Sequence, residues 1–188
     1  MPRAKPTLAL LALLLLAVLA CGPCSLFSRT APSSQESVPT IEVSQAAAQR
    51  LEDKLREQLQ ENPNPQFLIR ITNEEATSLV NARLAEAEEP PIQEPRVWFT
   101  RGHIYVSGRL VNLVPAPMDA LLVASVKVVD GQARLHFDDA TVGTVKVPKV
   151  VLSELEQTVN DALATAQINL TITEVQVREG ELVVVGRK

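Results

Sequence analysis

A run of alternating apolar and polar residues between positions 96 and 142 constrains the fold of this chain more than any other feature of its sequence. Successive side chains of a strand point to opposite faces, so a period of two predicts strands with one apolar face. Arg101 with Gly102, and Asp130 with Gly131, interrupt the run where such strands must turn, and Asp-Gly favours a tight hairpin. This pattern is typical of an antiparallel sheet that is covered on one side.

Helical periodicity in three further segments predicts the cover for that sheet. Apolar residues recur at three- and four-residue spacing in residues 41–60, 72–87 and 148–165. Thr72 and Glu75 have the spacing of a capping box, which starts the second helix and its apolar stripe of Leu79 and Val80. Short strands are predicted at residues 66–71, 168–178 and 181–187. The order of elements indicates an α+β fold in which a curved antiparallel meander packs on a long amphipathic helix, with additional N-terminal helices.

Composition excludes several classes of function. The net charge of −4 comes without a cluster of Lys or Arg, whereas nucleic-acid binding needs clustered cations. With 7 Gly, 2 His and 2 Cys, the chain has few residues for a phosphate-binding loop or a metal site. We therefore expect no nucleic-acid partner, no metal and no cofactor.

The side chains that resemble parts of an active site have simpler interpretations. His136, Asp138 and Asp139 are close in sequence, but alternation puts Asp139 on the face opposite the other two, whereas zinc needs three or four convergent ligands. Ser107 and Ser153 lack the Gly-x-Ser-x-Gly setting of a nucleophile. We expect these residues to be solvated, and the protein to have no catalytic residues.

The residues expected on the inner face of the sheet are mostly aliphatic. Trp98 and Phe99 are neighbours on a strand, so one is expected inside and the other on the outer face or at the mouth of a groove. Medium-sized aliphatic residues on a curved sheet leave room for a channel that suits a flexible chain. A dry core, closed by the same helix and sheet, is the alternative that the pattern leaves open.

Residues 1–20 have the pattern of a signal peptide. Arg3 and Lys5 precede a 13-residue apolar run at positions 8–20, which is shorter than the roughly 20 residues that span a bilayer as a helix. The run ends in Val-Leu-Ala-Cys at residues 18–21, which resembles a bacterial lipobox, where the Cys is acylated and becomes the new N-terminus. Cys21 is thus the predicted site of lipid modification.

Other interpretations of this segment stay open. An uncleaved membrane anchor, or ordinary signal cleavage, also agrees with the apolar run. Cys21 and Cys24 have the spacing of a thioredoxin-type Cys-x-x-Cys, although that chemistry needs the motif between a strand and a helix. Residues 25–40 are rich in Ser, Pro and Thr, so residues 21–40 are interpreted as a lipidated Cys with a flexible tether, and residues 41–188 as a single domain.

Several local motifs occur in one order along this predicted domain. A strand leads into the capped helix at residues 69–76, Gly102 precedes an alternating strand at 103–108, Gly143 precedes a Pro-initiated helix that contains Asn160, and a hairpin follows at 175–182. In these motifs residues 67–186 resemble the small, single-repeat bacterial relatives of the tubular lipid-binding (TULIP) superfamily, which are lipoproteins or membrane-anchored proteins of the cell envelope. The resemblance implies a strongly twisted antiparallel sheet wrapped around a long helix, an apolar groove between them for acyl chains, and no catalytic residues.

The function that this resemblance implies is that of a bacterial envelope lipoprotein, anchored to the membrane through Cys21, whose domain lies outside the cytoplasm. The domain would bind or shuttle a lipid or another apolar small molecule. The expected groove residues are inward-facing positions of the sheet and the long helix: Ile104, Val106, Leu122, Ala124, Val126, Leu135, Phe137, Leu155 and Val159. The alternative is a structural or accessory protein at the membrane surface, with a filled core and no ligand.

Overall fold

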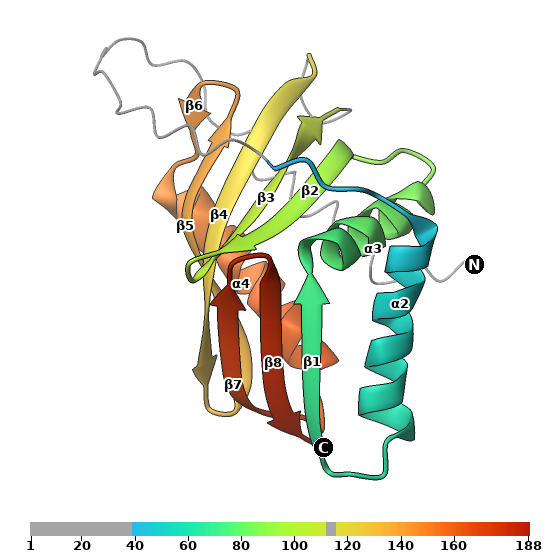
Figure 1. Cartoon of the computed structure of the whole chain (residues 1–188). Helices are drawn as coiled ribbons and strands as arrows, with labels where there is room; N and C mark the ends of the chain where they lie inside the picture. Colours follow the sequence, from blue (N-terminus) through green and yellow to red (C-terminus); the bar gives the residue numbers. More distant parts are fainter. Residues whose placement is uncertain (1–38, 112–115) are drawn as a thin grey trace, which may run out of the picture.

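The computed structural model describes residues 39–111 and 116–188. Its elements are, in chain order, α2 (Gln45–Arg56), the π-helix η2 (Glu57–Glu61), β1 (Gln66–Thr72), α3 (Asn73–Ala85), β2 (Ile92–Thr100), β3 (His103–Leu110), β4 (Met118–Val129), β5 (Gln132–Val142), β6 (Val145–Lys146), α4 (Lys149–Ala166), β7 (Thr171–Arg178) and β8 (Glu181–Arg187). The strands pair antiparallel in two sheets, one in the order β1-β8-β7 and one in the order β2-β3-β4-β5-β6 (Figure 1). The chain therefore has an α+β fold, as the sequence predicts.

The predictions for residues 1–38 lie outside the described residues, and these include lipid modification at Cys21 and the Cys-x-x-Cys spacing with Cys24. Within the described part of the chain, no helix is both long enough and apolar enough to cross a membrane. Signal cleavage, lipidation and the tether therefore stay predictions.

The predicted hairpins are confirmed, including the last one, in which Arg178 of β7 pairs with Glu181 of β8. Arg101 and Gly102, between β2 and β3, have φ angles of 46° and 89°, and Asp130 and Gly131, between β4 and β5, have φ angles of 52° and 75°. Two consecutive residues with positive φ make the tight turn whose twist matches that of the flanking strands. These turns fix the register of four strands, and the register decides which residues share a face of the sheet.

The capping box at the start of α3 is also confirmed. The Thr72 hydroxyl accepts a hydrogen bond from the Glu75 backbone amide, and the Glu75 carboxylate accepts one from the Thr72 amide. The same carboxylate is buried and accepts from Lys54 Nζ of α2, with its two oxygens at 2.6 and 2.9 Å. Glu75 therefore begins one helix and joins it to another.

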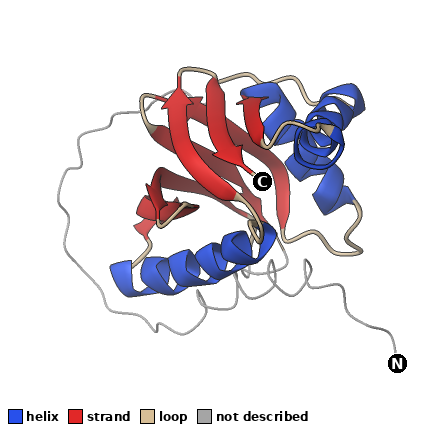
Figure 2. Cartoon of the chain, turned by 90° about the horizontal axis from the view of Figure 1, so that it is seen from below, coloured by secondary structure: helices blue, strands red, loops and turns tan. Residues whose placement is uncertain are grey.

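The prediction of one sheet wrapped around a helix needs correction, because the strands form two sheets. β1 pairs with β8 rather than with β2. Phe67 and Ile69 of β1 pack with Ile172 of β7, and alternation alone does not reveal which strands pair. α4 packs on β5, and Figure 2 shows it on one side of the strands, with α2 and α3 gathered at another.

The expectation for Trp98 and Phe99 is wrong in one respect. They are adjacent residues of β2, so their side chains point to opposite faces, yet both are buried, with 4% and 3% of their surface exposed. Trp98 stacks on Tyr105 of β3, with the ring centroids 5.2 Å apart. The outer face of the sheet is covered at this point, so Trp98 does not lie at the mouth of a groove.

Candidate functional site

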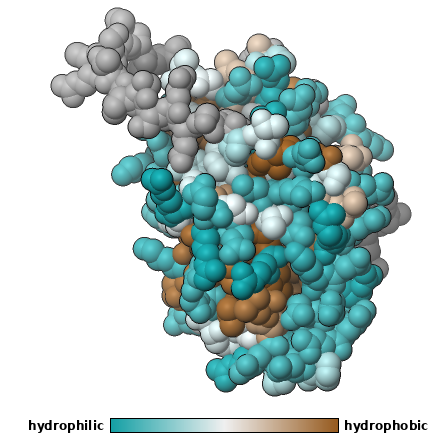
Figure 3. Space-filling model, viewed as in Figure 1, coloured by the Kyte–Doolittle hydropathy of each residue, from teal (hydrophilic) through white to brown (hydrophobic). Residues whose placement is uncertain are grey.

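One face of the five-stranded sheet packs against α4, and this face carries predicted groove residues. Figure 3 shows that the face toward the viewer is mostly hydrophilic over this sheet, while hydrophobic residues gather lower, over the three-stranded sheet. The strand register puts the seven predicted groove residues of the sheet into three adjacent rows: Ile104, Ala124 and Phe137; Val106 and Leu122; Val126 and Leu135. These seven residues therefore share one face, which we call the inner face.

α4 brings its predicted residues to this inner face. Leu155 and Val159 pack against a cluster of buried residues that is formed by the sheet and by Leu152 of the same helix. Six of the nine predicted residues belong to this cluster: Leu122, Ala124, Leu135, Phe137, Leu155 and Val159. Ile104, Val106 and Val126 lie on the same face by register but are not part of the cluster.

The inner face is only partly covered. Of the nine predicted residues, Ala124 and Phe137 are buried, and the other seven are half-buried. In α4 itself, Leu152 is the single buried residue. Part of the aliphatic surface of these seven residues therefore stays accessible to solvent.

Two carboxamide side chains hold α4 along the edge of β5. Asn160 accepts a hydrogen bond from Leu135 N at 2.9 Å and donates one to Leu135 O at 2.8 Å. Gln167 bonds to the N and O atoms of Ala133 in the same way, at 2.8 and 3.1 Å. An edge strand otherwise leaves such groups unpaired, so α4 takes the place of a neighbouring strand.

Glu156 adds a third bond to this edge, because its carboxylate accepts from Phe137 N at 3.0 Å. The same Oε2 atom lies 2.8 Å from Nδ1 of His136, and the Asp138 carboxylate lies 3.9 Å from Nε2 of that ring. His136 is exposed, so this pair belongs to the surface. In residues 39–111 and 116–188, no group of three or more His, Cys, Asp or Glu side chains is arranged to hold a metal ion.

The sequence predictions give no role in the site to these three edge-binding residues, of which Glu156 and Asn160 lie in α4 and Gln167 is its C-cap. A signal for them exists: Glu156, Asn160 and Gln167 are spaced by four and seven residues, which places them on one side of a helix. Leu155 and Val159 each precede one of them directly. The side of α4 that contacts the sheet is therefore part apolar and part polar, which a search for an apolar stripe does not detect.

Two hollows open elsewhere on the surface. One, of about 390 Å³, lies on the outer face of the five-stranded sheet and is lined in part by Ser107. The other, of about 340 Å³, lies between α3 and the start of β2. None of the nine predicted groove residues lines either hollow. Ser153, the second serine considered, donates its hydroxyl hydrogen to Val150 O within α4, at 2.8 Å.

Comparison with known proteins adds little to this geometry. No family model matches the chain, and no curated protein matches its sequence. One solved structure, described as the crystal structure of lipopolysaccharide binding protein, is similar over 78% of this chain, with 10% sequence identity and a TM-score of 0.19. The chain covers 36% of that protein. A similarity this weak establishes neither the fold family nor the function of the present chain.

Proposed function

We propose that the domain binds a flexible apolar ligand, such as an acyl chain, between α4 and the inner face of the five-stranded sheet, and that it does so without catalysis. One observation supports this proposal most directly. Seven residues of the inner face and α4 are aliphatic, yet they stay half-buried. Removal of aliphatic side chains from water is favourable. A ligand that covers these residues would therefore gain the hydrophobic free energy of the surface that the folded protein leaves exposed.

The free energy of binding would come from apolar surface alone. Each methylene group that moves from water onto the inner face contributes about 0.8 kcal/mol. The side chains that would receive it are branched and carry no polar atoms, so they select for an apolar chain but not for a particular reacting group. The affinity for an acyl ligand with several methylene groups would therefore be the sum of many small contributions.

We further propose that the domain belongs to a bacterial envelope lipoprotein and is a single-repeat relative of the TULIP superfamily. Support comes from the signal pattern of residues 1–20 and from the order of motifs over residues 67–186. An acylated Cys21 would keep the inner face close to the membrane from which a lipid is taken. Cell fractionation tests this part: the Cys21→Ser variant should leave the membrane fraction or stay unprocessed, and retention of a processed variant would contradict the proposal.

A pair of Phe substitutions on β4 tests the ligand site itself. Val126 faces the inner side, whereas Val123, on the same strand, pairs with Tyr105 on the outer face. If the space beside α4 is open, the ring of Val126→Phe enters it, leaves the free energy of unfolding nearly unchanged and blocks uptake of a fluorescent fatty acid. Val123→Phe is the matched control and should leave probe binding intact.

The opposite result would identify a filled core. In a closed core, the larger side chain of Val126→Phe costs about 1–3 kcal/mol. A wild-type protein that binds no acyl probe, together with a clearly destabilised Val126→Phe variant, would contradict the proposal and favour the accessory-protein alternative. Thermal unfolding of the ligand-free proteins and probe titration supply both measurements.

A further inference from the structure

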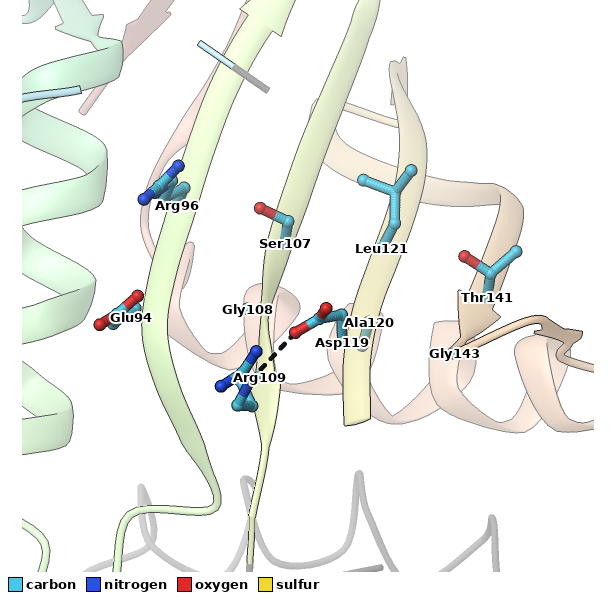
Figure 4. Close-up of a pocket in the computed structure, with 10 residues that line it drawn as sticks. All are labelled: Glu94, Arg96, Ser107, Gly108, Arg109, Asp119, Ala120, Leu121, Thr141 and Gly143. Atoms are coloured by element: carbon cyan, nitrogen blue, oxygen red, sulfur yellow. Dashed lines mark hydrogen bonds and ion pairs between the residues drawn. The ribbon is translucent and has the colours of Figure 1, made fainter. Parts of the chain in front are cut away.

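The hollow on the outer face of the five-stranded sheet lies on the side away from the inner face. The register lines up four of its residues in one row across β2, β3, β4 and β5: Arg96, Ser107, Leu121 and Thr141. Figure 4 shows this row, with Arg109 and Asp119 beside it. Charged groups and hydroxyl groups from four strands thus line one open hollow of about 390 Å³.

The strand that carries Arg96 has an unusual backbone at this hollow. β2 bulges just before Arg96, and Glu94 has a φ of 49°, in a region that is unfavourable for residues with a side chain. Between the two, Pro95 is buried, and its carbonyl oxygen accepts a hydrogen bond from Asn81 Nδ2 of α3 at 2.9 Å. Bulges and strained residues that neighbours hold in place are concentrated at binding sites.

Several polar side chains at this hollow keep their hydrogen-bonding capacity. Arg109 and Asp119 are bonded to each other at 3.1 Å. Within the described part of the chain, no hydrogen bond or ion pair is made by four other lining side chains: Glu94, Arg96, Ser107 and Thr141. The last three of these are half-buried, so fewer water molecules can reach them than reach a fully exposed group. The hollow therefore offers an unpaired cation, an unpaired anion and two hydroxyl groups to a ligand.

We propose that this hollow binds a small zwitterion in which an oxyanion and an ammonium group are a few atoms apart. The Arg96 guanidinium and the Ser107 hydroxyl, which pair on neighbouring strands, donate to the oxyanion, as guanidinium and hydroxyl groups commonly do. The Glu94 carboxylate accepts from the ammonium group. A simple anion is a poorer match, because the negative charges of Glu94 and Asp119 balance the positive charges of the two arginines that line the hollow, Arg96 and Arg109. This site is on the opposite face from the proposed apolar ligand and does not depend on it.

Titration calorimetry of the full chain with O-phosphoethanolamine tests this proposal. We expect this probe to bind at least about tenfold more tightly than inorganic phosphate or ethanolamine alone. Phosphate can make only the contact with Arg96, and ethanolamine only the contact with Glu94, whereas the probe makes both charge-assisted contacts. Arg96→Ala and Glu94→Gly should each weaken binding by a similar factor. Glu94→Gly removes the side chain at a positive φ, so its thermal midpoint should not fall, and lost binding is then distinguishable from lost folding.

Matched controls and a source test complete the experiment. Arg134→Ala and Glu88→Gln change exposed charges outside the hollow and should leave the affinity unchanged. If the protein binds phosphatidylethanolamine vesicles but not phosphatidylglycerol vesicles, and Arg96→Ala abolishes this binding, the zwitterion is a lipid headgroup. If the protein binds neither kind of vesicle, the zwitterion is a free molecule. The proposal is overturned if the probe does not bind at millimolar concentration. It is also overturned if inorganic phosphate binds as tightly as O-phosphoethanolamine, both to the wild-type protein and to Glu94→Gly.

Discussion

The two long edges of the five-stranded sheet are closed by helices with similar chemistry. At the β2 edge, Asn73, Thr77 and Asn81 of α3, each four residues apart, bond to the backbone of Phe99, Val97 and Pro95. At the β5 edge, polar residues of α4 and its C-cap residue bond in the same manner to alternate residues: Ala133, Leu135 and Phe137. In both places side chains at helical spacing satisfy strand groups that a further strand would otherwise bind.

The two edges differ in how deeply they are buried. Thr77 is 0% exposed and Ser78 is 2% exposed, because α3 lies between α2 and β2. α4 packs mainly on β5 and buries only Leu152. The α3 edge is therefore a fixed part of the structure, whereas the α4 edge combines hydrogen bonds to the sheet with apolar surface that stays accessible. If the proposed apolar ligand binds, the accessible surface beside α4 is where it would reach the inner face.

The largest expected effect is at the buried edge. Thr77→Val keeps the shape of the side chain but removes the hydroxyl that accepts from Val97 N and donates to Val97 O, both at 2.9 Å. Two buried backbone groups lose their partner, and each such loss costs about 1–3 kcal/mol, so we expect the free energy of unfolding to fall by about 2–4 kcal/mol. Urea unfolding measures this change.

Thr77→Ser is the control for that variant. It keeps the hydroxyl and loses one methyl group, so it should cost clearly less than Thr77→Val. If the two variants lose the same stability, methyl packing and not hydrogen bonding holds α3 on β2. The comparison between the two edges would then no longer rest on shared chemistry.

The sequence predicts the α4 side of the fold better than the α3 side. Leu155 and Val159 contact the sheet as their spacing indicates, because that part of α4 meets an apolar face. In α3 the spacing predicts an apolar stripe, of which Leu84 is buried but the other members stay half-buried: Ala76, Leu79, Val80, Leu84 and Ala87. The other residues that the helix buries are Glu75, Thr77 and Ser78. The reason is physical: α3 meets a strand edge, which presents polar backbone groups, and hydrophobic periodicity carries no information about such a contact.

The candidate site shows the same limit within one strand. The tight turns fix the register, so the alternation correctly puts the seven predicted groove residues of the sheet on one face. The alternation predicts Asp139 on the face opposite His136, but both lie on the outer face, where Asp139 pairs with Val123 and His136 pairs with Ser125. A bulge in β5 between these pairs adds one residue and resets the alternation. Nothing in the apolar pattern marks that position.

A smaller effect is expected at the accessible edge, where Asn160→Ala removes both side-chain bonds to Leu135. Asn160 is half-buried, so water can replace the lost partner, and we expect a loss of about 1 kcal/mol in the free energy of unfolding. Hydrogen exchange locates the change: the amide of Leu135 should exchange faster, while that of Val97 at the other edge should not. Gln157→Ala, at an exposed position of the same helix, is the control. If the Val97 amide exchanges as fast as the Leu135 amide in Asn160→Ala, the two edges unfold together, and α4 does not open separately beside the proposed ligand site.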